Sequence, residues 1–153
     1  MSVAVDANLI AALVLPLPYS DQATQGVTAW KRAGVALLAP LLLEYEMATI
    51  LRKAVVARWL TPDLAVEAMA KVLALNIHRL PPTPNLHEQA LRWAHRLGHS
   101  KAYDAHYLAV AEQEQVELWT ADRRLANDAR QAGAAWVRWI GEIATPGNKA
   151  TSG

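Results

Sequence analysis

Residues 2–14, with the sequence SVAVDANLIAALV, predict a short buried strand followed directly by a helix. The strand covers Ser2–Val5, and the helix continues until Pro16 stops it. Asp6 lies at the junction, where a carboxylate can cap the helix or bind a cation. The stretch therefore favours an α/β fold with an acidic residue at the end of its first strand.

The rest of the chain repeats this alternation. Thr61-Pro62 and Thr83-Pro84 are helix starts, in which a capping residue precedes a proline at the first helical position. Ser20 is expected to cap a helix ending at Gly34, and Pro40 to open a helix ending near Arg58. Strands are predicted at 2–5, 35–39, 76–80, 117–120 and 136–139. The pattern predicts a three-layer α/β/α domain around a central, mostly parallel five-stranded sheet.

Length and composition limit the possible classes of protein. A chain of 153 residues is expected to form one domain, over residues 1–140, followed by a polar tail at 141–153. The apolar fraction of 53% excludes a disordered chain. The absence of cysteine excludes disulfides and thiolate zinc sites and indicates a cytoplasmic protein. The apolar runs are broken by proline and too short to cross a bilayer, so no membrane association is expected.

Four acidic residues are candidate metal ligands: Asp6, Glu46, Asp104 and Asp122. Three of them lie where a strand or loop gives way to a helix, and such junctions gather at one edge of a parallel sheet. Carboxylates in one pocket repel each other unless a cation neutralises them, and hard oxygen ligands suit Mg²⁺ or Mn²⁺. The alternative is structural, because each aspartate could simply cap the helix beside it.

Glu46 is the acid that capping explains least well. It shares one helical ridge with Leu42 and Ile50, and a carboxylate on an apolar ridge is costly to bury without a partner or a metal. Glu44 points roughly 200° away from Glu46, because successive residues turn by about 100°, so both cannot face one site. Glu46 is the predicted ligand, and Glu44 is expected to be solvated or paired with a basic residue.

Four motifs, taken together and in this order, make the chain resemble a PIN-domain ribonuclease of the VapC toxin type. They are VDAN at 5–8, the helix PLLLEYEMATIL at 40–51 with Glu46, YDAHYLAVAE at 103–112, and TADRRLA at 120–126. Thr49 stands where many relatives have asparagine. The resemblance covers residues 3 to about 139.

The resemblance implies a PIN-like nuclease domain over residues 1–140 that hydrolyses RNA as the toxin of a toxin–antitoxin pair. Asp6, Glu46, Asp104 and Asp122 would be its catalytic residues and hold Mg²⁺ or Mn²⁺, which activates the attacking water. It also implies a homodimer and a cognate VapB-like antitoxin. The alternatives are a PIN-like RNA-processing nuclease that is not a toxin, and a catalytically idle PIN-like binding module.

Other polar residues near the motifs have possible roles of their own. Asn8 and Thr120 would orient ligands or water, or else form turn and cap hydrogen bonds. Lys101, Arg123 and Arg124 would contact RNA phosphates, or else be solvated charges at helix ends. His95 and His99 do not fit a zinc site, because Gly98 is expected to end the helix between them and ligating pairs normally share one continuous turn.

Two other acidic Mg²⁺ folds fit poorly. A haloacid-type phosphatase requires Asp-x-Asp after the first strand, whereas this chain has Asp6-Ala7-Asn8. A receiver domain requires a phosphoacceptor aspartate after its third strand, which here runs into Pro81-Pro82. The sequence therefore favours the nuclease.

Overall fold

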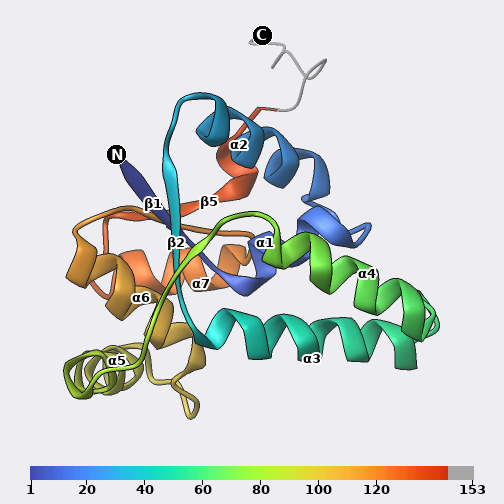
Figure 1. The fold of residues 1–153 in the computed structure, drawn as a ribbon. Coiled ribbons are helices and arrows are strands. Elements are labelled where there is room, and N and C mark those ends of the chain that lie inside the picture. Colours follow the sequence, from blue (N-terminus) through green and yellow to red (C-terminus); the bar gives the residue numbers. More distant parts are fainter. Residues whose placement is uncertain (145–153) are drawn as a thin grey trace, which may run out of the picture.

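The computed structural model describes residues 1–144 and contains a five-stranded parallel sheet in the order β3-β2-β1-β4-β5 (Figure 1). This arrangement confirms the predicted α/β class and the central parallel sheet. The strands are β1 (Ser2–Val5), β2 (Ala36–Pro40), β3 (His78–Leu80), β4 (Leu118–Thr120) and β5 (Val137–Trp139). The helices are α1 (Ala7–Val14), α2 (Ser20–Arg32), α3 (Leu42–Val56), α4 (Pro62–Leu73), α5 (Pro84–Leu97), α6 (Tyr103–Glu114) and α7 (Arg123–Gln131), with a 3₁₀ turn η1 at Ile140–Glu142.

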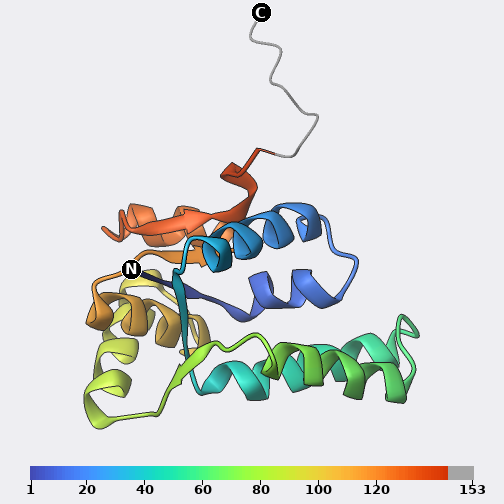
Figure 2. The same cartoon turned by 45° about the horizontal axis from the view of Figure 1, so that its top comes forward.

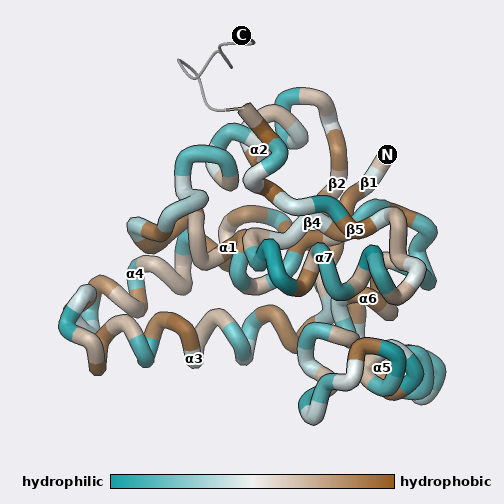
Figure 3. The backbone as a smooth tube through the Cα atoms, turned by 180° about the vertical axis from the view of Figure 1, so that it is seen from behind, coloured by the Kyte–Doolittle hydropathy of each residue, from teal (hydrophilic) through white to brown (hydrophobic). Residues whose placement is uncertain are grey.

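Helices cover both faces of the sheet. Because connections between parallel strands are right-handed, α1–α4 lie on one face of the sheet and α5–α7 on the other. The contacts between helices agree with this: α1 contacts α2, α3 and α4, and α5 contacts α6. Helices α3 and α4 lie side by side as a hairpin that projects beyond the sheet (Figures 1 and 2). Helix α7 is largely hydrophilic along its length, as expected for the outer layer (Figure 3).

The hydrophobic core lies between the sheet and the helices that face it. In β1 the side chains of Val3, Ala4 and Val5 are all buried, as expected for a central strand covered on both faces. Helix α6 is buried on nearly every side, since Tyr107, Leu108 and the neighbouring alanines and valine up to Ala111 are inaccessible. Within residues 1–144, no helix has the length and apolarity needed to cross a membrane.

Several predicted helix signals are confirmed. The side chains of Thr61 and Thr83 accept hydrogen bonds from the backbone N–H groups of Leu64 and Leu86, at 3.2 and 3.1 Å. A proline follows each of them at the first helical position. Gly98 adopts φ +69° directly after α5, a conformation that favours glycine.

Two predicted boundaries are wrong. Ser20 is the first residue of α2 and does not cap it; its hydroxyl accepts from Leu17 N at 2.9 Å and donates to Leu15 O at 2.7 Å. The hydroxyl therefore closes the preceding loop. Pro40 is the last residue of β2, paired with Leu80, and α3 begins two residues later. A proline is tolerated there because the strand ends at this residue.

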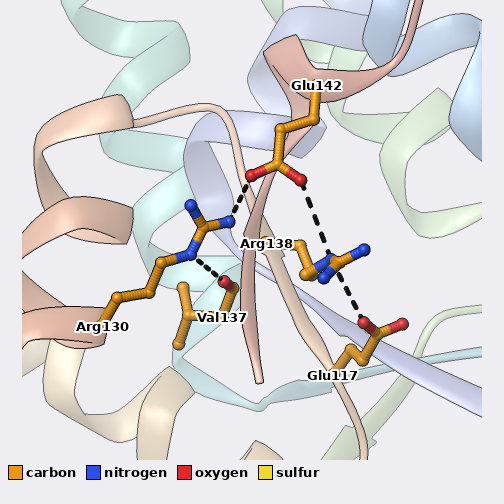
Figure 4. Close-up of polar contacts among 5 residues, drawn as sticks. All are labelled: Glu117, Arg130, Val137, Arg138 and Glu142. Atoms are coloured by element: carbon orange, nitrogen blue, oxygen red, sulfur yellow. Dashed lines mark hydrogen bonds and ion pairs between the residues drawn. The ribbon is translucent and has the colours of Figure 1, made fainter. Parts of the chain in front are cut away.

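The C-terminal part of the described chain packs on the domain. A Cβ at Gly26 of α2 would come within 3.0 Å of Ile143 and 3.1 Å of Ile140, so η1 lies closely against α2. In Figure 4, Arg130 donates to Val137 O at 2.7 Å and pairs with Glu142, while Arg138 pairs with Glu117 at 3.3 Å and with Glu142 at 3.8 Å. Residues 145–153 of the expected tail at 141–153 lie outside the described residues, and the boundary at residue 140 stays a prediction.

Candidate metal centre

Asp6 and Asp122 lie at the carboxyl ends of β1 and β4, which are neighbours in the sheet. Asp6 N donates to Trp119 O at 3.3 Å, so the two strand ends are directly joined. The chain leaves β1 toward β2 on one side and returns to β4 on the other, so the strand order reverses between β1 and β4. In open α/β sheets, ligand sites form outside the strand ends at such a switch point.

Asp6 is a buried carboxylate with one free oxygen. The residue is 2% exposed; Oδ1 accepts a hydrogen bond from Leu9 N at 2.9 Å as the cap of α1, while Oδ2 has no partner. The pKa of Asp6 is raised to about 7, chiefly by burial; the Thr120 side chain and the Leu9 N–H act to lower it, and the charges of Asp104 and Asp122 act to raise it. A cation beside Oδ2 would relieve both the desolvation and the repulsion.

Apart from aromatic residues, Thr120 and Asp6 are the only polar residues that are buried within residues 1–144. The Thr120 hydroxyl oxygen accepts from Asp122 N at 2.9 Å. The Thr120 side chain also lowers the pKa of Asp6, although it does not form a hydrogen bond to Oδ2 with proper geometry. Thr120 therefore connects the two acidic strand ends.

Asp122 and Asp104 line one cavity of about 410 Å³. Asp122 caps α7, with Oδ1 accepting from Leu125 N at 3.1 Å. Asp104 lies in the first turn of α6, and no side chain caps that helix, so capping does not explain Asp104. Burial and the charge of Asp122 raise the pKa of Asp104, while His99 lowers it.

Glu46 reaches the site from α3. It lines a second cavity together with Asp104, and its Oε1 is buried without a partner. Burial raises the pKa of Glu46, Asp104 raises it further, and Tyr107 lowers it. Glu44 instead pairs with Arg79 at 3.1 Å, as expected for the acid on the opposite side of the helix.

The carboxylate oxygens of the four acids are the kind of ligand that a hard divalent cation prefers. In this structure they do not converge on a single point. Among residues 1–144, no group of three or more acidic or histidine side chains is arranged to hold a metal ion. Like charges favour such separation, and the caps engage one oxygen each of Asp6 and Asp122. Binding of a cation therefore requires the uncapped carboxylates, those of Glu46 and Asp104, to turn toward Asp6 and Asp122. The free, buried Oδ2 of Asp6 and Oε1 of Glu46 are available for this.

Of the remaining predicted residues, three line cavities beside the acids and one is directed away from them. Lys101 lines the cavity that contains Glu46 and Asp104, and Arg124 lines the one that contains Asp104 and Asp122. Asn8 is exposed and lines a third cavity beside Asp122. The guanidinium of Arg123, by contrast, lies over the ring of Trp139 at 4.9 Å and so is directed to β5.

Two further residues lie near the acids and were not predicted to be part of the site: His99, which was considered only as a zinc ligand, and Tyr107. His99 lines both acidic cavities, beyond the left-handed Gly98 that separates it from His95. Tyr107 lies in the core against Glu46. The sequence could have indicated that Tyr107 faces the site, because it is three residues from Asp104 on α6 and residues three apart share a helix face.

Comparisons with known proteins agree with this fold. The PIN domain family model matches residues 3–131. Ribonuclease VapC1 of Mycobacterium tuberculosis is 35% identical over 88 residues, which are 58% of this chain and 64% of that protein. The chain thus matches less than two thirds of the length of this curated relative.

Solved structures extend the similarity to nearly the whole chain. PAE2754 from Pyrobaculum aerophilum is 29% identical with a TM-score of 0.63, covering 93% of this chain and 94% of that one. A toxin–antitoxin complex from Klebsiella pneumoniae is 20% identical with a TM-score of 0.62, covering 92% and 99%, which shows a shared fold. Because the family model spans most of the residues that build the sheet and the acidic site, this chain belongs to the PIN domain family.

Proposed function

We propose that this PIN domain, over residues 1–140, is a divalent-metal-dependent endoribonuclease. The observation that carries the proposal is the buried Asp6 at the strand switch point, with Oδ2 unpartnered and its pKa raised by burial and by Asp104 and Asp122. The similarity to ribonuclease VapC1 supports RNA as the substrate. Capping of α1 uses only Oδ1 of Asp6. It does not explain why the second oxygen, Oδ2, is buried without a partner, which is costly for a carboxylate.

The residues that would hold Mg²⁺ or Mn²⁺ are Asp6, Glu46, Asp104 and Asp122. The chemistry that such a cation supplies when bound is Lewis acidity, which acidifies water and offsets the charge of a phosphodiester. The caps to Leu9 N and Leu125 N fix the directions of Asp6 and Asp122 before any ligand arrives. Such prior orientation reduces the reorganisation that binding requires.

The surrounding residues would bind the RNA backbone and orient polar groups. Lys101 and Arg124 line the acidic cavities and can pair with phosphates on either side of the cleaved bond. Asn8 and Thr120 would hold ligands or water in place, Thr120 through its bond to Asp122 N. The scissile phosphate and the carboxylates are both negative, so a bound cation would be needed to offset their repulsion.

The test is the chemistry of the product ends. Hydrolysis by water is expected to leave a 5′-phosphate and a 3′-hydroxyl, read from labelled RNA by ligation and by phosphatase treatment. A 2′,3′-cyclic phosphate would mean that the RNA 2′-hydroxyl had attacked, and the proposed mechanism would be wrong. RNA left intact with Mg²⁺ and Mn²⁺ would favour an idle binding module.

We further infer that the protein is the toxin of a toxin–antitoxin pair. The resemblance to VapC toxins motivates this, as does the fold shared with the K. pneumoniae complex. A peptide that inserts an arginine or lysine among Asp6, Glu46 and Asp104 would pair with these carboxylates and compete with the metal.

Co-expression with the product of the adjacent small reading frame should give a stable complex without ribonuclease activity. If no such product binds and expression does not slow growth, the toxin role fails while the nuclease role can stand.

A homodimer is the proposed assembly, with the α3–α4 hairpin as its interface. Large apolar side chains are exposed there, including Val56, Trp59, Leu64 and Val66 at 67, 59, 47 and 71%. An apolar patch of this kind on a projecting hairpin commonly marks an interaction surface.

A further inference from the structure

Tyr107 carries a buried hydroxyl that packing alone does not explain. The residue is 1% exposed within α6, and its hydroxyl has no hydrogen-bond partner. A buried polar group without a partner costs about 1–3 kcal/mol. Such a group in a native fold therefore calls for an explanation.

The hydroxyl lies near the acids of the site, since Glu46, Asp6 and Asp104 all influence it, and Oε1 of Glu46 is likewise buried without a partner. The pKa of the Tyr107 phenol is raised far above its usual range. Burial is the largest cause, the charge of Glu46 is the next, and the charges of Asp6 and Asp104 also raise it. A tyrosine phenol is protonated at neutral pH, so toward a carboxylate the Tyr107 hydroxyl can only be a donor. Glu46 is the acid that acts on it most strongly.

Glu46 is also the candidate ligand with the fewest other constraints. Asp6 and Asp122 are each held by a backbone N–H, at 2.9 and 3.1 Å. Glu46 has a longer side chain and no such bond, and its buried Oε1 has no partner. Tyr107 lowers the pKa of Glu46, as a donor to that carboxylate does, although neither the Tyr107 hydroxyl nor Glu46 Oε1 has a hydrogen-bond partner in this structure.

We propose that Tyr107 is a positioning residue, whose hydroxyl donates a hydrogen bond to Oε1 of Glu46 and directs the other carboxylate oxygen toward the cation. This inference rests on the proposed metal-dependent function. Tyr107 acts through Glu46 and is not itself a ligand. It performs for Glu46 the role that helix N–H groups perform for the two capping aspartates, namely to orient an acid before the metal binds.

The experiment compares Mn²⁺ binding to metal-stripped wild type and Tyr107→Phe by titration calorimetry. Loss of the orienting hydroxyl should weaken Mn²⁺ binding by about 10–100-fold, the usual effect of removing a group that holds a metal ligand. Tyr45→Phe is the matched control, because it makes the same chemical change at an exposed position beside Glu46. Its affinity should equal that of wild type.

A second background separates positioning from packing. In Glu46→Ala, which removes the acceptor, Tyr107→Phe should cause little further loss of Mn²⁺ affinity, because two residues acting through one contact are not additive. An equal loss in both backgrounds would overturn the inference. So would a Tyr107→Phe protein that binds Mn²⁺ like wild type while melting at a lower temperature in EDTA, since that result assigns the hydroxyl to core stability.

The outcomes also separate this inference from the proposed function. Wild type without measurable Mn²⁺ affinity would overturn both. Wild type and Tyr107→Phe of equal affinity, with binding lost in Asp104→Asn, would overturn the inference alone.

Should Tyr107→Phe fail to fold, wild type with labelled tyrosine rings gives the answer by NMR, because the chain has only four tyrosines. The resonance left after assigning the other three must then shift on adding Mg²⁺, and an unchanged resonance would refute the role.

Discussion

Asp6 uses one carboxylate oxygen to cap α1 and keeps the other free and buried. The capping and metal-binding interpretations of this residue are therefore compatible, because they concern different oxygens. Asp122 likewise caps α7 through one oxygen. A sequence pattern typical of a helix cap thus does not argue against a ligand at the same position.

Asp6→Asn should abolish RNA cleavage without unfolding the protein. The amide oxygen can still accept from Leu9 N, and the variant no longer buries a charge, so the melting temperature in EDTA should hold or rise. Cleavage should fall by at least about 100-fold, the upper range for lost metal-site groups. Thermal melts and cleavage rates measured together check this, and cleavage at the wild-type rate would leave Asp6 as a cap only.

The raised pKa of Asp6 predicts how metal-free stability depends on pH. Between about pH 4 and 7 the folded state keeps a proton that the unfolded state has released, because the pKa rises from 3.8 to about 7 on folding. Stability must then fall as pH rises through this window, by at most about 4 kcal/mol. Urea unfolding in EDTA at pH 5 and pH 8 measures it. The pH dependence should be smaller in Asp6→Asn, and identical curves for both proteins would contradict the assignment.

At the scale of elements, α3 presents its two acids to different surroundings. Glu44 pairs with Arg79 on β3, whereas Glu46 lies beside Asp104 and Tyr107. We expect Glu46→Gln to lower cleavage strongly and Glu44→Gln to change it by less than about twofold, since the partly exposed Glu44–Arg79 ion pair lies away from the site and such pairs contribute little. Parallel cleavage assays compare the two variants. The reverse order of effects would mean that the wrong face of α3 was assigned to the site.

Local signals in the sequence were sufficient for much of the fold. The bounds of β1 and the caps at Thr61 and Thr83 were predictable because each depends on a few adjacent residues. The predictions for Ser20 and Pro40 failed because loop closure and strand pairing, which involve distant residues, determined their roles. Tertiary contacts outweighed local propensity at both positions.

The candidate site was partly predictable for the same reason. Acidic residues at strand ends follow a general rule of parallel sheets, so Asp6 and Asp122 could be placed near each other. The burial of Thr120 and the contact of Tyr107 with Glu46 depend on packing among α3, α6 and the sheet, which no local pattern encodes. The stacking of Arg123 on Trp139 has the same origin.

At the scale of the whole molecule, we expect a homodimer in solution. The exposed apolar side chains of the α3–α4 hairpin would be covered by a second copy. Light scattering at micromolar concentration should give twice the mass of the chain, and Val66→Lys should give a folded monomer. Leu91→Lys is the matched control, because Leu91 is similarly exposed but lies on α5, on the other face of the sheet. A monomeric wild type would exclude the proposed assembly.

The central claim is that the acids gathered at the carboxyl ends of β1 and β4 form one metal centre for RNA cleavage. The most direct measurement is RNA cleavage by wild type and Asp104→Asn after exhaustive chelation, followed by stepwise return of Mg²⁺. Wild type should be inactive in EDTA and regain activity with rising Mg²⁺, while Asp104→Asn should remain inactive at every concentration. Full activity of chelated wild type, or equal recovery of Asp104→Asn, would contradict the account.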